Sequence, residues 1–95
     1  MEGVDMVQFG PCDYSLNTGK AGRWEDPEVQ RKQRDMIELA LKKGVHPRVE
    51  LDNFEKAPQF IEMGVRHFCI GWELLTIFQW CKHHGEGLRE LLAKV

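Results

Sequence analysis

Hydrophobic residues along the chain follow first the spacing of a strand and then the spacing of a helix, and this pair of patterns occurs three times. Strand-like patterns cover residues 3–10 (GVDMVQFG), 46–51 (HPRVEL) and 65–71 (VRHFCIG). Each is followed by a segment whose apolar residues have helical spacing, over residues 26–44, 54–64 and 73–94. A strand and a helix repeated in this way predict an α/β fold, parallel βαβαβα, with right-handed helical crossovers.

The helix over residues 26–44 is signalled at both ends. Asp26 can cap its free N–H groups, Pro27 suits the first helical position, and Gly44 can adopt the left-handed conformation that stops it. Its apolar stripe is Val29, Met36, Ile37, Ala40 and Leu41. This stripe predicts the face of the helix that packs on the sheet.

The remaining elements have weaker signals. Pro47 is acceptable only at the beginning of its strand, and Pro58 predicts that the second helix starts late or bends. Gly85 and Gly87 predict a kink in the last helix, and residues 11–26 a long loop. The last helix is apolar on more than one side, through Leu74, Leu75, Phe78, Trp80 and Cys81, which predicts contact with a surface outside this chain.

Composition narrows the choice of partners. The 13 basic and 15 acidic residues are mixed along the chain, so we expect no nucleic acid partner. No apolar run approaches the roughly 20 residues that span a bilayer, and the start, MEGVDMVQ, has acids where a signal peptide has basic residues. We therefore expect a cytoplasmic protein without a membrane partner. Cys12, Cys69 and Cys81 form no CxxC pair and are expected to be reduced thiols.

Three acidic residues follow the three predicted strands, where the working groups of parallel α/β proteins gather. Asp52 and Glu73 have an equally simple interpretation as a helix cap and a complement to a helix dipole. Asp13 lies in the turn Gly10-Pro11-Cys12-Asp13. It either holds a hard cation beside N–H groups that accept an anion, or only stabilises an Asx-turn. The pattern alone leaves both interpretations open.

Beyond these local signals, the chain resembles one known family. The segment GVDMVQFGPCDYSLNTG resembles the sixth-strand segment of the HpcH/HpaI aldolase family, which includes citrate-lyase β-type proteins. DPEVQ, KKGVHPRVEL and FIEMGVRHFCIGWELL follow in the order expected for the end of that barrel. The resemblance implies that residues 1–95 are a partial, three-unit C-terminal fragment of a TIM (β/α)8 barrel. A closed barrel needs about 250 residues.

The resemblance also implies a chemistry, that of a class II lyase in which Mg²⁺ or Mn²⁺ acts on a pyruvate-type 2-oxo acid and an aldehyde. In this family the Asp of the Gly-Pro-x-Asp turn is a metal ligand, a role that falls on Asp13. Backbone N–H groups at Cys12 and Asp13 would bind the substrate carboxylate, while Gly10 and Pro11 shape the turn. Cys12 stands where the family more often has Ala or Ser.

The family's second metal ligand, a Glu, its catalytic His and its substrate-binding Arg come from earlier strands that this chain does not contain. No catalytic residue is therefore assigned here, and we expect the isolated chain to be inactive. The alternative is a non-catalytic interaction module, a homo-oligomer formed through the last helix, because family members commonly oligomerise through C-terminal helices. A stand-alone three-stranded domain with an unrelated role is a third possibility.

Overall fold

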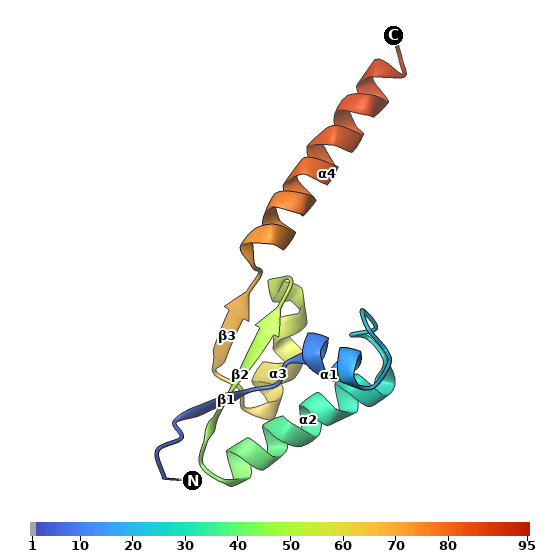
Figure 1. Ribbon diagram of the computed structural model, residues 1–95. Helices are drawn as coiled ribbons and strands as arrows, with labels where there is room; N and C mark the ends of the chain where they lie inside the picture. Colours follow the sequence, from blue (N-terminus) through green and yellow to red (C-terminus); the bar gives the residue numbers. More distant parts are fainter. Residues whose placement is uncertain (1) are drawn as a thin grey trace.

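The computed structural model describes residues 2–95 and confirms the predicted parallel α/β alternation (Figure 1). Strands β1 (Met6–Gln8), β2 (His46–Leu51) and β3 (His67–Ile70) form a parallel sheet in the order β1-β2-β3. In its register Val7 lies beside Pro47, and Val49 lies beside Phe68. Because consecutive parallel strands are neighbours, their carboxyl ends meet along one rim of the sheet.

The helices follow the strands in turn. They are α1 (Pro11–Asn17), α2 (Pro27–Lys42), the 3-10 turn η1 (Phe54–Lys56), α3 (Ala57–Met63) and α4 (Glu73–Leu92). Pro58 falls in the first turn of α3, so the prediction that this helix starts late is confirmed. Helix α2 begins and ends as predicted, since the Asp26 carboxylate accepts a hydrogen bond from the Glu28 N–H at 2.9 Å and Gly44 has a φ of 70°.

The prediction of a loop over residues 11–26 is wrong in its first half, because residues 11–17 form α1. Pro11 presets a helical φ at the first position, and the Tyr14 N–H donates to the Gly10 carbonyl at 2.9 Å. The buried Ser15 hydroxyl donates to the Cys12 carbonyl, so its polar atom has a partner inside the helix. The rest of the segment, residues 18–26, is the connection to α2.

The core lies between the sheet and helices α2 and α3. It is a cluster of Ile37, Val49, Leu51, Phe60 and Val65. Along β2 the alternate residues Pro47, Val49 and Leu51 are buried against the helices, whereas His46, Arg48 and Glu50 point to the opposite face. No helix covers that opposite face among the residues that the structure describes.

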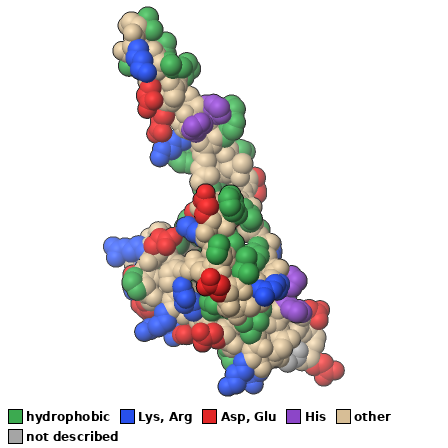
Figure 2. Space-filling view, turned by 180° about the vertical axis from the view of Figure 1, so that it is seen from behind, with side chains coloured by type: hydrophobic (Ala, Val, Ile, Leu, Met, Phe, Trp, Pro, Cys, Tyr) green, Lys and Arg blue, Asp and Glu red, His purple; other side chains and the backbone are tan. Residues whose placement is uncertain are grey.

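Helix α4 projects away from this body (Figure 1) and accounts for extents of 63 × 29 × 23 Å. The kink expected at Gly85 and Gly87 is not present, since the helix runs without interruption from Glu73 to Leu92. No residue of α4 is buried. Figure 2 shows its hydrophobic side chains open to the surroundings. Within residues 2–95, no helix combines the length and the apolar character that a membrane crossing requires.

Candidate functional site

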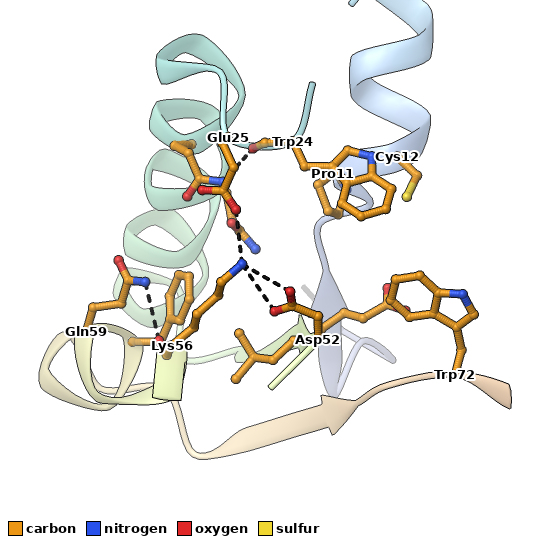
Figure 3. Close-up of a pocket in the computed structure, with 13 residues that line it drawn as sticks. Pro11, Cys12, Trp24, Glu25, Asp52, Lys56, Gln59 and Trp72 are labelled. Carbon is orange, nitrogen blue, oxygen red and sulfur yellow. Dashed lines mark hydrogen bonds and ion pairs between the residues drawn. The ribbon is translucent and has the colours of Figure 1, made fainter. Parts of the chain in front are cut away.

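A cavity of about 90 Å³ opens at the rim where the strands end. Segments that follow all three strands contribute to it: Pro11 and Cys12 after β1, Asp52 after β2, and Trp72 after β3. Figure 3 shows these residues together with side chains from the α1–α2 connection and from η1 and α3. The full lining is Pro11, Cys12, Trp24, Glu25, Gln30, Gln33, Glu50, Leu51, Asp52, Lys56, Gln59, Phe60 and Trp72.

The Gly10–Asp13 turn lies at this rim, directly after β1 and at the start of α1. Asp13 is exposed, and its carboxylate folds back over Gly10. A Cβ atom added at Gly10 would lie 3.0 Å from Oδ2 of Asp13, so the close approach of the carboxylate depends on the absence of a side chain there. Pro11 and Cys12 line the cavity, whereas Asp13 is not part of its lining.

The Cys12 thiol lies among negative charges. Partial burial raises its pKa, and the carboxylates of Glu50 and Asp13 raise it further. The thiol is therefore held in its protonated form at neutral pH, and it is a poor nucleophile or metal ligand. Cys12, Cys69 and Cys81 are all free thiols in the structure, in agreement with the expectation of reduced cysteines.

The described residues do not complete a metal centre. Within residues 2–95 there is no group of three or more His, Cys, Asp or Glu side chains arranged to hold a metal ion. Asp13 supplies one exposed carboxylate at the rim, and the further oxygen ligands that a hard cation needs are not gathered around it. The role of Asp13 as a metal ligand therefore stays a prediction.

Lys56 joins two separate segments across the cavity (Figure 3). Its Nζ lies 3.0 Å from Oε1 of Glu25, in the α1–α2 connection, and 3.2 Å from the carboxylate oxygens of Asp52. Hydrogen bonds to Glu25, first of all, and to Asp52 raise the pKa of Lys56. Its charge therefore persists at neutral pH and holds the connection against the end of β2.

This pairing separates the two interpretations of Asp52. The residue before η1 is Asn53, and neither η1 nor α3 has a side-chain cap, so Asp52 is not a helix cap. It faces the cavity instead. Glu73 lies in the first turn of α4, is exposed and does not line the cavity, which agrees with a role beside the helix dipole.

Two tryptophans form one wall of the cavity. The rings of Trp24 and Trp72 meet edge to face with centroids 6.1 Å apart. The Gln30 amide fixes Trp24 by donating to its backbone carbonyl at 2.7 Å, and the Gly71 N–H next to Trp72 donates to the Leu51 carbonyl at 2.7 Å. The wall thus joins the α1–α2 connection to the start of α4.

Sequence reasoning missed the contributions of Gln33 and Lys56. Gln33 lies between Val29 and Ile37 on the buried side of α2, and this helical spacing could have indicated a polar residue on the core-facing side. No signal in the sequence pairs Lys56 with Glu25, because they lie 31 residues apart and meet only through the fold.

Comparison with known proteins identifies similar chains but no family model that matches. The 4-hydroxy-2-oxo-heptane-1,7-dioate aldolase of Klebsiella pneumoniae is 32% identical over 71 residues, which are 75% of this chain and 27% of the relative. The Escherichia coli protein of that name is 34% identical over the same share. The chain therefore spans about a quarter of the length of these curated relatives.

Two solved structures share the fold. An HpcH/HpaI aldolase from Desulfitobacterium hafniense superposes with a TM-score of 0.81 at 23% identity, over 94% of this chain and 35% of that one. An HpcH/HpaI aldolase/citrate lyase family protein from Burkholderia cenocepacia gives 0.77 at 20% identity, over 93% and 34%. The three βα units therefore match part of an aldolase barrel, and the resemblance noted in the sequence is confirmed over that part.

Proposed function

We propose that this chain contributes one rim of a carbon–carbon lyase site, because it is similar to HpcH/HpaI aldolases over most of its length. Residues 1–95 would be a C-terminal part of the barrel. The substrates would be a pyruvate-type 2-oxo acid and an aldehyde. The observation that carries the proposal is the position of the Gly10–Asp13 turn after β1 of a parallel sheet, because the sites of such barrels lie at that end of the strands.

The chain's own contribution would be binding and orientation. The first N–H groups of α1 have no partner within the helix, so those of Cys12 and Asp13 can donate to a substrate carboxylate. Gly10 leaves room for the Asp13 carboxylate to fold over the turn. Asp13 would be the chain's ligand to Mg²⁺ or Mn²⁺, which when bound polarises a carbonyl oxygen. The general acid–base group and the other ligands would have to come from outside residues 2–95.

Mn²⁺ titration followed by NMR tests this proposal. Paramagnetic broadening should appear first at the backbone amides of residues 10–14 and should disappear in Asp13→Ala. Asp35→Ala removes a carboxylate from the exposed side of α2 and is the matched control, so it should leave the broadening at residues 10–14 unchanged. Broadening that survives Asp13→Ala would refute Asp13 as the ligand.

The same samples test catalysis. With Mn²⁺ and pyruvate in deuterium oxide, we expect weak binding and no exchange of the pyruvate methyl protons, because one carboxylate does not make a complete site. Exchange above that of Asp13→Ala would show that the isolated chain is active and would overturn the expected inactivity.

A second candidate function is self-association through α4. The three- and four-residue spacing of a coiled-coil seam runs from residue 74 to residue 91. Five of its six positions are Leu74, Ile77, Cys81, Leu88 and Leu91, all exposed, and the sixth is His84. Residues 2–95 offer no surface that covers this seam. We therefore infer that copies of the chain associate through it as a homo-oligomer.

Light scattering tests this candidate. Leu88→Glu places a charge in the seam and should convert an oligomer into a monomer. Gln79→Glu adds the same charge outside the seam on an exposed position and should leave the mass unchanged. A wild-type chain that is monomeric at high concentration would count against this function.

A further inference from the structure

The cavity at the rim has more negative than positive charge. Glu25, Glu50 and Asp52 line it, and Lys56 is its one cationic side chain among the described residues. Lys56 is shared between Glu25 and Asp52, so it offsets only one of the three carboxylates. The surplus favours a cation over an anion in the remaining space.

Gln33 supplies an independent sign of a ligand. It is 4% exposed, it lies on the inner side of α2, and it lines the cavity. The neighbouring Gln30 donates to the Trp24 carbonyl, whereas the Gln33 side-chain amide makes no hydrogen bond within residues 2–95. Its amide is not among the side-chain atoms that are fully closed off from solvent without a partner, so it is open to the cavity. An amide that faces the cavity without a protein partner is available to bond to a ligand there.

The tryptophan wall opposite Lys56 favours an organic cation over a metal ion. Trp24 and Trp72 present aromatic surface to the cavity, and the faces of indole rings attract organic cations (Figure 3). A hard metal ion would instead need a set of several oxygen ligands, and no such group is gathered among residues 2–95. The mixed apolar and acidic lining therefore fits an alkylammonium better than a metal ion.

We propose that this cavity binds a small primary alkylammonium group. Its N–H groups would donate to the Gln33 amide oxygen and to Asp52 or Glu50, while its alkyl part would lie against Trp24 and Trp72. A volume of about 90 Å³ limits the bound group to a few non-hydrogen atoms. Pro11 and Cys12 line this cavity and Asp13 does not, so the ammonium site borders the proposed carboxylate site but uses neither Asp13 nor a metal ion.

The test uses the full chain and propylammonium chloride, with 1-propanol and sodium propionate as neutral and anionic probes of similar size at constant ionic strength. The indole N–H signals report binding, because Trp24 and Trp72 line the cavity and Trp80 lies on α4 away from it. We expect saturable shifts of the Trp24 and Trp72 signals with propylammonium, a fixed Trp80 signal, affinity at least about tenfold weaker for propanol, and no saturation with propionate.

Variants separate this site from general attraction to an acidic surface. Gln33→Met keeps the size of the side chain and removes the amide, and should weaken propylammonium binding by about fivefold or more. Asp52→Asn should weaken it by about threefold or more. Glu38→Gln, on the exposed side of α2, is the charge-matched control and should leave it unchanged. Thermal unfolding confirms that each variant is folded.

Three results would overturn the proposal: propanol binding as tightly as propylammonium, shifts that grow without saturating, or Gln33→Met binding as the wild type does. Each can occur whether or not Mn²⁺ broadens residues 10–14. Failure of the ammonium site is therefore distinguishable from failure of the lyase proposal.

Discussion

Helices α2 and α4 both carry apolar residues at helical spacing, but their surroundings are opposite. In 16 residues α2 buries Val29, Gln33, Ile37 and Ala40, whereas α4 has 20 residues and buries none. The apolar side chains Leu74, Ile77, Phe78, Leu88 and Leu91 of α4 are all exposed. An apolar stripe therefore determines that a helix has a packing face, and the rest of the chain determines whether that face is covered.

The difference matters energetically because most of the stability of protein helices comes from packing of the apolar face rather than from intrinsic propensity. Helix α2 obtains this packing from β2 and α3. Helix α4 would obtain it only from a surface outside residues 2–95. Substitutions should accordingly change the free energy of unfolding strongly at the buried positions of α2 and weakly in α4.

The largest effect is expected in the core under α2. Ile37 is fully buried, so Ile37→Ala should lower the free energy of unfolding by about 2–5 kcal/mol, a large part of the stability of a chain this small. Urea unfolding followed by circular dichroism measures it. Leu39, two residues away, is 57% exposed, and Leu39→Ala should cost less than about 1 kcal/mol. If Ile37→Ala prevents folding, Ile37→Val should still cost about 0.5–1.5 kcal/mol.

Replacing a glycine by alanine should change the stability in opposite directions in the two regions. Gly64 ends α3 at a φ of 108° with Leu41 close by, so Gly64→Ala should destabilise the chain by about 1–2 kcal/mol. Gly85 lies inside α4 with open space around it, and Gly85→Ala should stabilise that helix by about 0.5–1 kcal/mol. Thermal unfolding and helix content by circular dichroism distinguish the two. A loss of helix content in Gly85→Ala would contradict the open surroundings of α4.

A smaller effect is expected at the Lys56 ion pairs. Lys56 is 41% exposed, so Lys56→Met should cost no more than about 1 kcal/mol and less at high salt. Its folded-state pKa is raised, so the contribution is fully present below about pH 10.5, the ordinary lysine value, and is lost as the pH rises through the higher folded value. Unfolding at neutral and alkaline pH measures it, with Lys32→Met on the exposed side of α2 as the control.

The smallest effect on unfolding is expected in α4 itself. Leu88 is 59% exposed, and in a monomeric sample Leu88→Ala should change the free energy of unfolding of the α/β body by less than about 0.5 kcal/mol. A cost near that of Ile37→Ala would mean that α4 is packed in solution. Measurement at several protein concentrations shows whether that packing comes from a second copy.

Much of the fold could be predicted because its signals are local. Asp26, Pro27 and Gly44 bound α2, and the alternation of His46–Leu51 identifies β2. Helix α1 was missed because Gly10 and Pro11 are typical of a turn and the helix that follows has only seven residues. The kink at Gly85 and Gly87 was expected because glycine weakens a helix, yet the cost for two glycines is modest beside 20 residues of continuous hydrogen bonding.

The site was predictable only in part. Parallel strands place Gly10–Asp13 and Asp52 at one rim, and that much follows from their positions after strands. The pairing of Lys56 with Glu25 and the contact of Trp24 with Trp72 depend on how the α1–α2 connection folds over the rim. Both contacts join residues more than 30 positions apart, where spacing patterns carry no information.

The attachment of α4 at Gly71 and Trp72 has a mechanical consequence. The helix is a rod about 30 Å long, held at its base by the Gly71–Leu51 hydrogen bond and the edge-to-face contact of Trp72 with Trp24. A tilt of about 10° at that base displaces the far end by about 5 Å. A partner bound at the C-terminal end of α4 would therefore change the angle at which Trp72 meets Trp24.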